Sequence, residues 1–303
     1  MLGFGRRHAV GEHEADGEIE RVYHEIRQTL RVTGVTLNFR TLAAYGPLLP
    51  ALWDALRPNL DTRAFEDAAD RVRAEAVGAA ARIGRLDAVG GLGLGESQHR
   101  QIQMALDLYH YVNPKLLVLT ALARLGFDGA AVETRRGRAA AVELIDRGVP
   151  GTMYPMEMVE EGPADPEVRA LFDDIQRTLA RPAVNSDYRT LALWPGYLAA
   201  VWSRLKPILA RQEYEWAAQG LGDTARALAR DLPYPVPLTR ERVTALGVDA
   251  EAVDERLAEF ERLLPKLALN VALFALDWTP AAALARSPFP VERRRFEADG
   301  GRR

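Results

Sequence analysis

The sequence predicts an all-α protein built from two related halves. Apolar residues recur at the three- and four-residue spacing of an amphipathic helix, and no stretch shows the alternation of a half-buried strand. Residues 18–58 also match residues 167–207 without a gap, at an offset of 149 positions. Two copies are too few for a solenoid. The expected architecture is therefore two similar helical halves packed about a pseudo-two-fold axis.

The first helix of each half is predicted from its apolar face. In the first half this face consists of Ile19, Val22, Tyr23, Ile26 and Leu30. The second half repeats the spacing with Val168, Leu171, Phe172, Ile175 and Leu179. The two segments are therefore expected to form equivalent helices.

The second helix of each half also has a repeated apolar face. Its members in the first half are Leu42, Tyr45, Leu49, Leu52, Trp53 and Leu56, and in the second half Leu191, Trp194, Leu198, Val201, Trp202 and Leu205. Pro47 and Pro195 are expected to kink these helices or to begin new ones. Further helices are predicted near 64–88, 97–124, 129–147, 211–230, 240–246 and 250–277.

Segments rich in proline, glycine and charge divide the chain. They predict a first helical repeat over 18–148, a connector over 149–166 and a second repeat over 167–285. The polar, proline-interrupted segment 286–303 is expected to be a loosely ordered tail.

The composition of the chain excludes several classes of function. A formal charge of −3 gives no overall basic surface, so a nucleic-acid partner is not expected. The absence of cysteine excludes disulfides, thiolate nucleophiles and cysteine-ligated metals. The longest apolar stretches, 116–123 and 267–276, are too short to cross a bilayer, and the N-terminal residues lack a signal-peptide core. A cytoplasmic protein without a membrane partner is expected.

Two possible cofactor sites have simpler explanations. The glycine-rich segment 90–95 follows no predicted strand and contains no Gly-Lys-Ser/Thr, so an interhelical loop is favoured over a nucleotide loop. The five histidines form no recognisable metal motif with other ligands. No cofactor and no metal are expected.

The two copies differ at one polar triplet. Residues 185–187 are Asn-Ser-Asp, whereas the equivalent residues 36–38 are Thr-Leu-Asn, although both copies continue with an aromatic residue and Arg-Thr-Leu-Ala. Such a triplet commonly caps a helix. A difference within an otherwise preserved motif favours the alternative, a site at which the halves have different roles.

A second difference lies near residue 113. Asn113 precedes Pro114-Lys115, and the equivalent residue before Pro265-Lys266 is Leu264. An asparagine is ordinary at a helix boundary before proline. An amide in one half and leucine in the other is also the pattern of a polar site between the halves.

The duplicated halves, the Asn-Ser-Asp-Tyr-Arg-Thr-Leu segment and the Tyr-Val-Asn-Pro-Lys segment resemble the group I 2-haloacid dehalogenases over about residues 18–285. The resemblance implies an all-α fold of two pseudo-repeats, a homodimer, and an active site between the halves. It implies hydrolysis of a small anionic substrate, a 2-haloalkanoic acid, to a 2-hydroxy acid with inversion, without a metal or a covalent intermediate.

The resemblance also implies site residues. The catalytic aspartate falls on Asp187, the water-positioning asparagine on Asn113 and a substrate-contacting serine on Ser186. Asn185 stands where members that accept only D-substrates carry asparagine. The expected substrate-binding set is Ser186, Asn185, Leu37 and Tyr111.

The chemistry of these residue types agrees. A carboxylate within reach of water can act as a general base, typically worth about 10²–10⁴-fold. An amide such as Asn113 can both donate to and accept from that water. The anionic substrate suits a helix N-terminus with a serine hydroxyl, and a second acid in place of Asn38 would repel it. Asp187 is therefore expected to be desolvated, with a raised pKa.

The resemblance has one departure. The segment Gly34-Val35-Thr36-Leu37 stands where the family carries aromatic pocket walls, which leaves the pocket shape open. A hydrolase of another 2-substituted acid and a non-catalytic binding protein for small carboxylates remain alternatives. Turnover with halide release distinguishes them.

Overall fold

The computed structural model describes residues 9–130, 142–162 and 165–291. Within these ranges the regular elements are helices, apart from one isolated bridge between Thr62 and Leu144. The all-α prediction is confirmed. None of the described helices combines the length and the apolar character that crossing a membrane requires.

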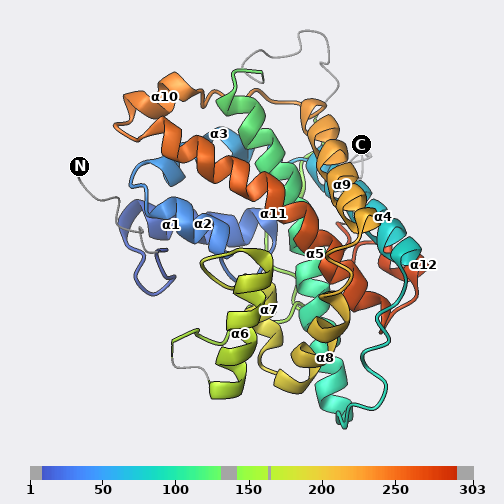
Figure 1. The fold of residues 1–303 in the computed structure, drawn as a ribbon. Coiled ribbons are helices and arrows are strands. Elements are labelled where there is room, and N and C mark those ends of the chain that lie inside the picture. The colour runs from blue at the N-terminus through green and yellow to red at the C-terminus, as the bar shows by residue number, and fades with distance from the viewer. Residues whose placement is uncertain (1–8, 131–141, 163–164, 292–303) are drawn as a thin grey trace, which may run out of the picture.

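Twelve helices follow one another along the described chain (Figure 1). The first five are α1 (Gly17–Leu30), α2 (Leu37–Ala43), α3 (Leu48–Leu60), α4 (Arg63–Ile83) and α5 (Glu96–Phe127). The others are α6 (Pro166–Leu179), α7 (Ser186–Leu191), α8 (Pro195–Leu205), α9 (Gln212–Arg230), α10 (Arg240–Ala245), α11 (Ala250–Leu276) and α12 (Ala281–Leu284).

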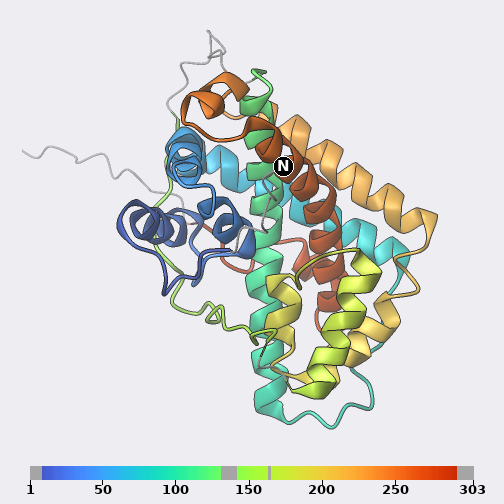
Figure 2. The same ribbon diagram turned by 60° about the vertical axis from the view of Figure 1, so that its left-hand side comes forward.

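Four long helices form the centre of the molecule. α5 and α11 pack against each other, and each also packs against α4 and α9 (Figure 1). α1–α3 and α6–α8 form two smaller groups against these central helices (Figure 2). α7 contacts α5, and α3 also contacts α5. The short helix α7 is thereby held beside α5, and α2 is held through its contact with α3.

One predicted helix differs from the structure. Residues 142–147 of the segment expected to be helical are not helical: Arg63 N donates to Glu143 O at 2.8 Å and Ile145 N to Asp61 O at 3.0 Å. Residues 131–141 lie outside the described residues. The backbone of residues 142–147 pairs with the distant segment 61–63. The apolar periodicity of residues 129–147 cannot reveal such a long-range contact.

Tertiary contacts recur at the 149-residue offset of the sequence match. Trp53 Nε1 donates to Glu25 at 2.8 Å, and Trp202 Nε1 donates to Asp174 at 2.9 Å. Edge-to-face ring pairs recur too, Phe39 with Trp53 and Tyr188 with Trp202. These residues of the two copies therefore make the same contacts in each half.

The correspondence extends beyond the matched sequence. Val10 N donates to Arg40 O at 3.0 Å, and Val159 N donates to Arg189 O at 3.1 Å. Val159 lies in the segment expected to be a connector, yet it has an equivalent in Val10. We propose that each repeat begins at these short N-terminal segments.

Near the C-terminus, Phe289 lies in the segment expected to be a loose tail. It is buried, with its ring 5.3 Å from that of Tyr111. Residues 292–303 lie outside the described residues. The fold thus uses part of this segment to cover α5.

A buried ion pair joins α4 to α5. Lys115 is fully buried and pairs with Glu66, and its Nζ also donates to Leu30 O at 3.0 Å and to Tyr111 Oη at 2.7 Å. Burial lowers the pKa of Lys115 to about 8 despite the nearby carboxylate. In the other half, Lys266 and Glu215 form the equivalent pair at the surface.

Removing one partner of this buried pair should destabilise the fold. We expect Lys115→Met to lower the free energy of unfolding by about 3–5 kcal/mol, because the buried Glu66 is left without its ion-pair partner. Adding Glu66→Leu should restore much of that loss. Urea unfolding measures both effects.

The matched control is Lys266→Met. Its pair is exposed, so a change of about 1 kcal/mol or less is expected. Equal losses for Lys115→Met and Lys266→Met would contradict this assignment.

Candidate active site

A narrow polar pocket lies between the ends of α2 and α7 and the sides of α5 and α11. Its volume of about 10 Å³ is close to the space that one water molecule needs. The lining residues are Thr36, Leu37, Asn38, Tyr109, Asn113, Leu116, Asn185, Ser186, Asp187, Leu264 and Leu267. Five of the six residues expected at the site are among them.

Equivalent positions of the two copies meet in this pocket. Both members of five pairs line it: Thr36 with Asn185, Leu37 with Ser186, Asn38 with Asp187, Asn113 with Leu264, and Leu116 with Leu267. The first three pairs are separated by 149 positions and the last two by 151. Equivalent positions of the two halves therefore line the pocket with side chains of different polarity.

Unpaired polar atoms concentrate here. Eight buried side-chain nitrogen or oxygen atoms of the described residues lack a hydrogen-bond partner, and five belong to this pocket: Thr36 Oγ1, Asn38 Nδ2, Asn113 Nδ2, Asn185 Oδ1 and Asp187 Oδ2. Buried polar groups are ordinarily satisfied, and an unsatisfied one costs about 1–3 kcal/mol. A cluster of them is typical of a site that binds a polar ligand.

Asp187 is the acidic residue of the pocket. Its side chain is buried, and Oδ1 accepts a hydrogen bond from Tyr188 N at 3.0 Å. Desolvation raises the pKa of Asp187 to about 7, opposed by backbone N–H groups and by the Asn113 amide. Asn113 Nδ2 and Asp187 Oδ2 nevertheless form no hydrogen bond with each other, since both atoms are unpaired. Oδ2 can therefore accept a proton near neutral pH.

The capping interpretation of the triplet is wrong for Asn185. Asn185 does occupy the N-cap position of α7, but its side chain makes no capping hydrogen bond and Oδ1 is unpaired. Ser186 Oγ instead accepts from the backbone N–H of Leu37 at 3.3 Å, which joins the first residues of α2 and α7. The Ser186 hydroxyl proton remains available to a ligand.

Tyr111 does not line the pocket, contrary to expectation. Its hydroxyl accepts from Lys115 Nζ at 2.7 Å and from Arg31 at 3.1 Å, within the buried cluster that contains Glu66. The reason is helix geometry, since residues two apart on a helix point to nearly opposite sides. Asn113 faces the pocket, so Tyr111 faces away.

Tyr109 is the residue that sequence reasoning missed. Its hydroxyl lies 3.1 Å from Ser186 O and 2.7 Å from Thr190 Oγ1, and burial raises its pKa so that it stays neutral. Thr190 in turn donates to Glu157 O at 2.6 Å. The available signal was its spacing, because Tyr109 lies four residues before Asn113 on the same face of one helix.

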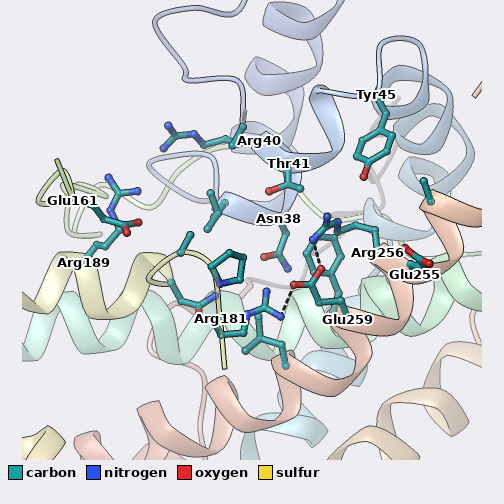
Figure 3. A pocket seen from close by; sticks show the side chains of 18 of the residues that line it. Asn38, Arg40, Thr41, Tyr45, Glu161, Arg181, Arg189, Glu255, Arg256 and Glu259 are labelled. Atoms are coloured by element: carbon teal, nitrogen blue, oxygen red, sulfur yellow. Dashed lines mark hydrogen bonds and ion pairs between the residues drawn. The ribbon is translucent and has the colours of Figure 1, made fainter. Parts of the chain in front are cut away.

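A larger groove opens beside the pocket. Its volume is about 990 Å³, and Leu37, Asn38 and Asn185 line both cavities. Asn38 points into the groove opposite an ion pair between Arg181 and Glu259, whose atoms are 2.5 Å apart (Figure 3). The groove and the pocket therefore adjoin at these three side chains.

The described residues hold no group of three or more His, Asp or Glu side chains arranged to bind a metal ion. The pocket offers instead one carboxylate, several amides and hydroxyls, and apolar walls. This set is suited to general-base chemistry on a small polar molecule.

Comparison with known proteins identifies relatives of this chain. The family model "Halocarboxylic acid dehydrogenase DehI" matches residues 33–188. An (R)-2-haloacid dehalogenase of Pseudomonas putida is 30% identical over 282 residues, 88% of this chain and 90% of its own. A configuration-inverting 2-haloacid dehalogenase of Alcaligenes xylosoxydans xylosoxydans is 28% identical over 92% of this chain and 96% of its own.

Solved structures agree as well. The crystal structure of a D-2-haloacid dehalogenase mutant is similar with a TM-score of 0.81 and 27% identity, over 89% of this chain and 95% of that chain. A complex of such a mutant with D-2-CPA has a TM-score of 0.78 at 26% identity, with the same coverage. The chain belongs to the DehI family of 2-haloacid dehalogenases.

The raised pKa of Asp187 predicts a pH-dependent stability. The folded pKa of about 7 exceeds the ordinary 3.8, so the folded state holds this proton more tightly than the unfolded chain. The resulting stabilisation is complete below about pH 4 and is lost as the pH rises through 7. Asp187→Asn should therefore gain stability relative to wild type by roughly 4 kcal/mol between pH 4 and pH 8.

Urea unfolding of both proteins at several pH values measures this difference. Using the difference between wild type and variant cancels every other titrating group. Parallel curves for the two proteins would show that Asp187 has an ordinary pKa.

Proposed function

We propose that the protein hydrolyses D-2-haloalkanoic acids to L-2-hydroxy acids with inversion, using water activated by Asp187. The observation that carries the proposal is the buried Asp187 carboxylate, with a pKa near 7, beside the unpaired amide of Asn113. The names of the family's members, including (R)-2-haloacid dehalogenases and configuration-inverting 2-haloacid dehalogenases, support the substrate class and the inversion.

In the proposed reaction, water lies between Asp187 Oδ2 and the Asn113 amide. As the water oxygen bonds to C2 of the substrate, Asp187 takes a proton and the C2–halogen bond breaks with its electron pair on the halide. Attack from the face opposite the halide inverts C2. Asp187 then returns its proton to solvent. Positioning by Asn113 restricts the water to the attacking trajectory.

The substrate carboxylate needs donors that are not already used. Thr36 Oγ1 and Asn38 Nδ2 are unpaired in the pocket, and Ser186 keeps its hydroxyl proton because its oxygen accepts from Leu37 N. We assign these three groups to the carboxylate. The amide of Asn38, in place of a second acid, avoids repulsion between the protein and an anionic substrate.

Entry of substrate requires side-chain movement. The inner pocket has room for about one water, which is less than a 2-halopropionate occupies. Leu37, Asn38 and Asn185 line both the pocket and the groove. We propose that these side chains move to admit the substrate.

The choice of enantiomer is assigned to Asn185, whose unpaired Oδ1 is in the pocket. This assignment rests on the resemblance. The homodimeric state and the cytoplasmic location stay predictions.

Racemic 2-chloropropionate tests the function directly. We expect chloride release to stop after half the substrate is consumed, with only the (R)-enantiomer lost and only (S)-lactate formed. Chiral chromatography and a chloride assay measure this outcome. Binding without chloride release would instead support a carboxylate-binding protein.

Loss of the base should slow this reaction strongly. Asp187→Asn is expected to lower kcat by at least about 10²-fold. The matched control is Asp277→Asn, another buried carboxylate, which accepts from Asp87 N and Ala88 N and lies outside both cavities. Retained activity in Asp187→Asn would exclude Asp187 as the base.

Stereochemistry does not distinguish direct attack by water from an ester formed on Asp187, because both invert C2 once. A single turnover in ¹⁸O-water, with enzyme in excess, does so. We expect ¹⁸O in lactate from the first turnover. Unlabelled lactate, with ¹⁸O later found in Asp187, would overturn the proposed role of water.

A further inference from the structure

A chain of hydrogen bonds lies behind the pocket, next to Asp187. Tyr188 on α7 accepts from Asn270 Nδ2 on α11 at 2.8 Å, and Tyr214 on α9 donates to Asn270 Oδ1 at 2.8 Å. All three side chains are fully buried. The chain thereby ties the short helix α7 to two long helices.

The other half has no polar residue at any of these positions. Phe39 is equivalent to Tyr188 and Phe65 to Tyr214, both at the offset of 149, and Leu119 is equivalent to Asn270 at the offset of 151. All three counterparts are buried. The polar chain is therefore confined to the half that carries Asp187.

The packing of the rings is otherwise similar. Tyr188 meets Trp202 edge-to-face at 5.9 Å, and Phe39 meets Trp53 edge-to-face at 6.2 Å. Since the phenylalanine fills its place without a hydroxyl, the fold of this region can be built with apolar side chains alone. The hydroxyls and the amide must then be explained by something other than filling the core.

Tyr188 also acts directly on the acidic residue. Its backbone N–H donates to Asp187 Oδ1 at 3.0 Å, so any shift of Tyr188 shifts the donor that orients the carboxylate. α7 has only six residues, too few to be stable without tertiary contacts. Tyr109 supports it from α5 at Ser186 O and Thr190, and the polar chain supports it from α9 and α11.

We propose that Tyr188, Asn270 and Tyr214 are positioning residues for Asp187, holding α7 so that the carboxylate keeps one orientation toward the pocket. This inference rests on the proposed function for its kinetic consequence. Its structural consequence, a fixed hydrogen bond from Tyr188 N–H to Asp187, can be measured without turnover.

The test converts the chain to the residues of the other half. The triple variant Tyr188→Phe/Asn270→Leu/Tyr214→Phe leaves no buried partner unpaired, and such coordinated replacement is often nearly neutral for stability. We expect kcat to fall by about 10-fold to 100-fold, the effect of a small misplacement of a catalytic group, with KM little changed.

The acid limb of kcat should also move to higher pH, because a weakened N–H contact stabilises the Asp187 carboxylate less. Tyr188→Phe alone, the smallest change, should move both quantities in the same direction if the triple variant does not fold. A folded variant with the kcat and pH profile of wild type would overturn the proposal.

The matched control is Tyr197→Phe. Tyr197 lies on α8, is also fully buried and lines neither cavity. Its hydroxyl accepts a hydrogen bond from Trp278 Nε1 at 3.0 Å. This variant should lose stability with an unchanged acid limb. An equal shift in Tyr197→Phe would show that the effect is general loosening of the fold.

A second readout separates this inference from the proposed function. The ¹³C resonance of the Asp187 carboxyl, assigned with Asp187→Asn, gives its pKa by titration. We expect a higher pKa in the triple variant. If wild type releases no halide, the proposed function fails, and an unchanged Asp187 pKa would independently overturn the positioning role.

Discussion

The burial of one carboxylate between four helices is the constraint on which the rest of the site depends. Removing Asp187 from water raises its pKa toward neutrality, so the carboxylate can take up a proton near neutral pH. The same burial requires partners for every neighbouring polar group, and several atoms of the pocket lack them. A polar substrate and a water molecule can supply those partners. Desolvation thus connects the reactivity of the site to its affinity for a ligand.

Matching segments of the two halves make equivalent contacts. The repeated tryptophan–carboxylate bonds and ring pairs hold each half in the same way. A few positions differ between the copies. Asp187 is equivalent to Asn38, Asn113 is equivalent to Leu264, and the hydrogen-bonded chain through Asn270 is equivalent to apolar residues. The differences concentrate around one pocket. One half contributes Asp187 and the polar chain through Asn270, and the other contributes the Asn113 amide and the uncharged side chains of Thr36 and Asn38.

Much of the site could be predicted, and the failures have geometric causes. Asp187 and Asn113 stood out because each differs from its counterpart in the other copy, and the structure brings both to one pocket. The resemblance implies Tyr111 as a substrate-binding residue, but the helix turns its side chain toward Lys115. Tyr109, on the correct face, was overlooked. Thr36 and Asn38 were noted for their differences but not as donors, since only the structure shows them unpaired.

The sequence by itself determined the helical class, the match between residues 18–58 and 167–207, and the identity of the polar residues that differ between these segments. Each of these follows from local periodicity or from direct comparison of two segments. Only the tertiary structure decided that Asn113 on α5 and Leu264 on α11 lie beside the triplets 36–38 and 185–187. These contacts join segments that are far apart in the chain. The tertiary structure also decided that Lys115 and Glu66 are buried while Lys266 and Glu215 are exposed. Burial depends on what covers a side chain, and pKa, hydrogen bonding and reactivity follow from it.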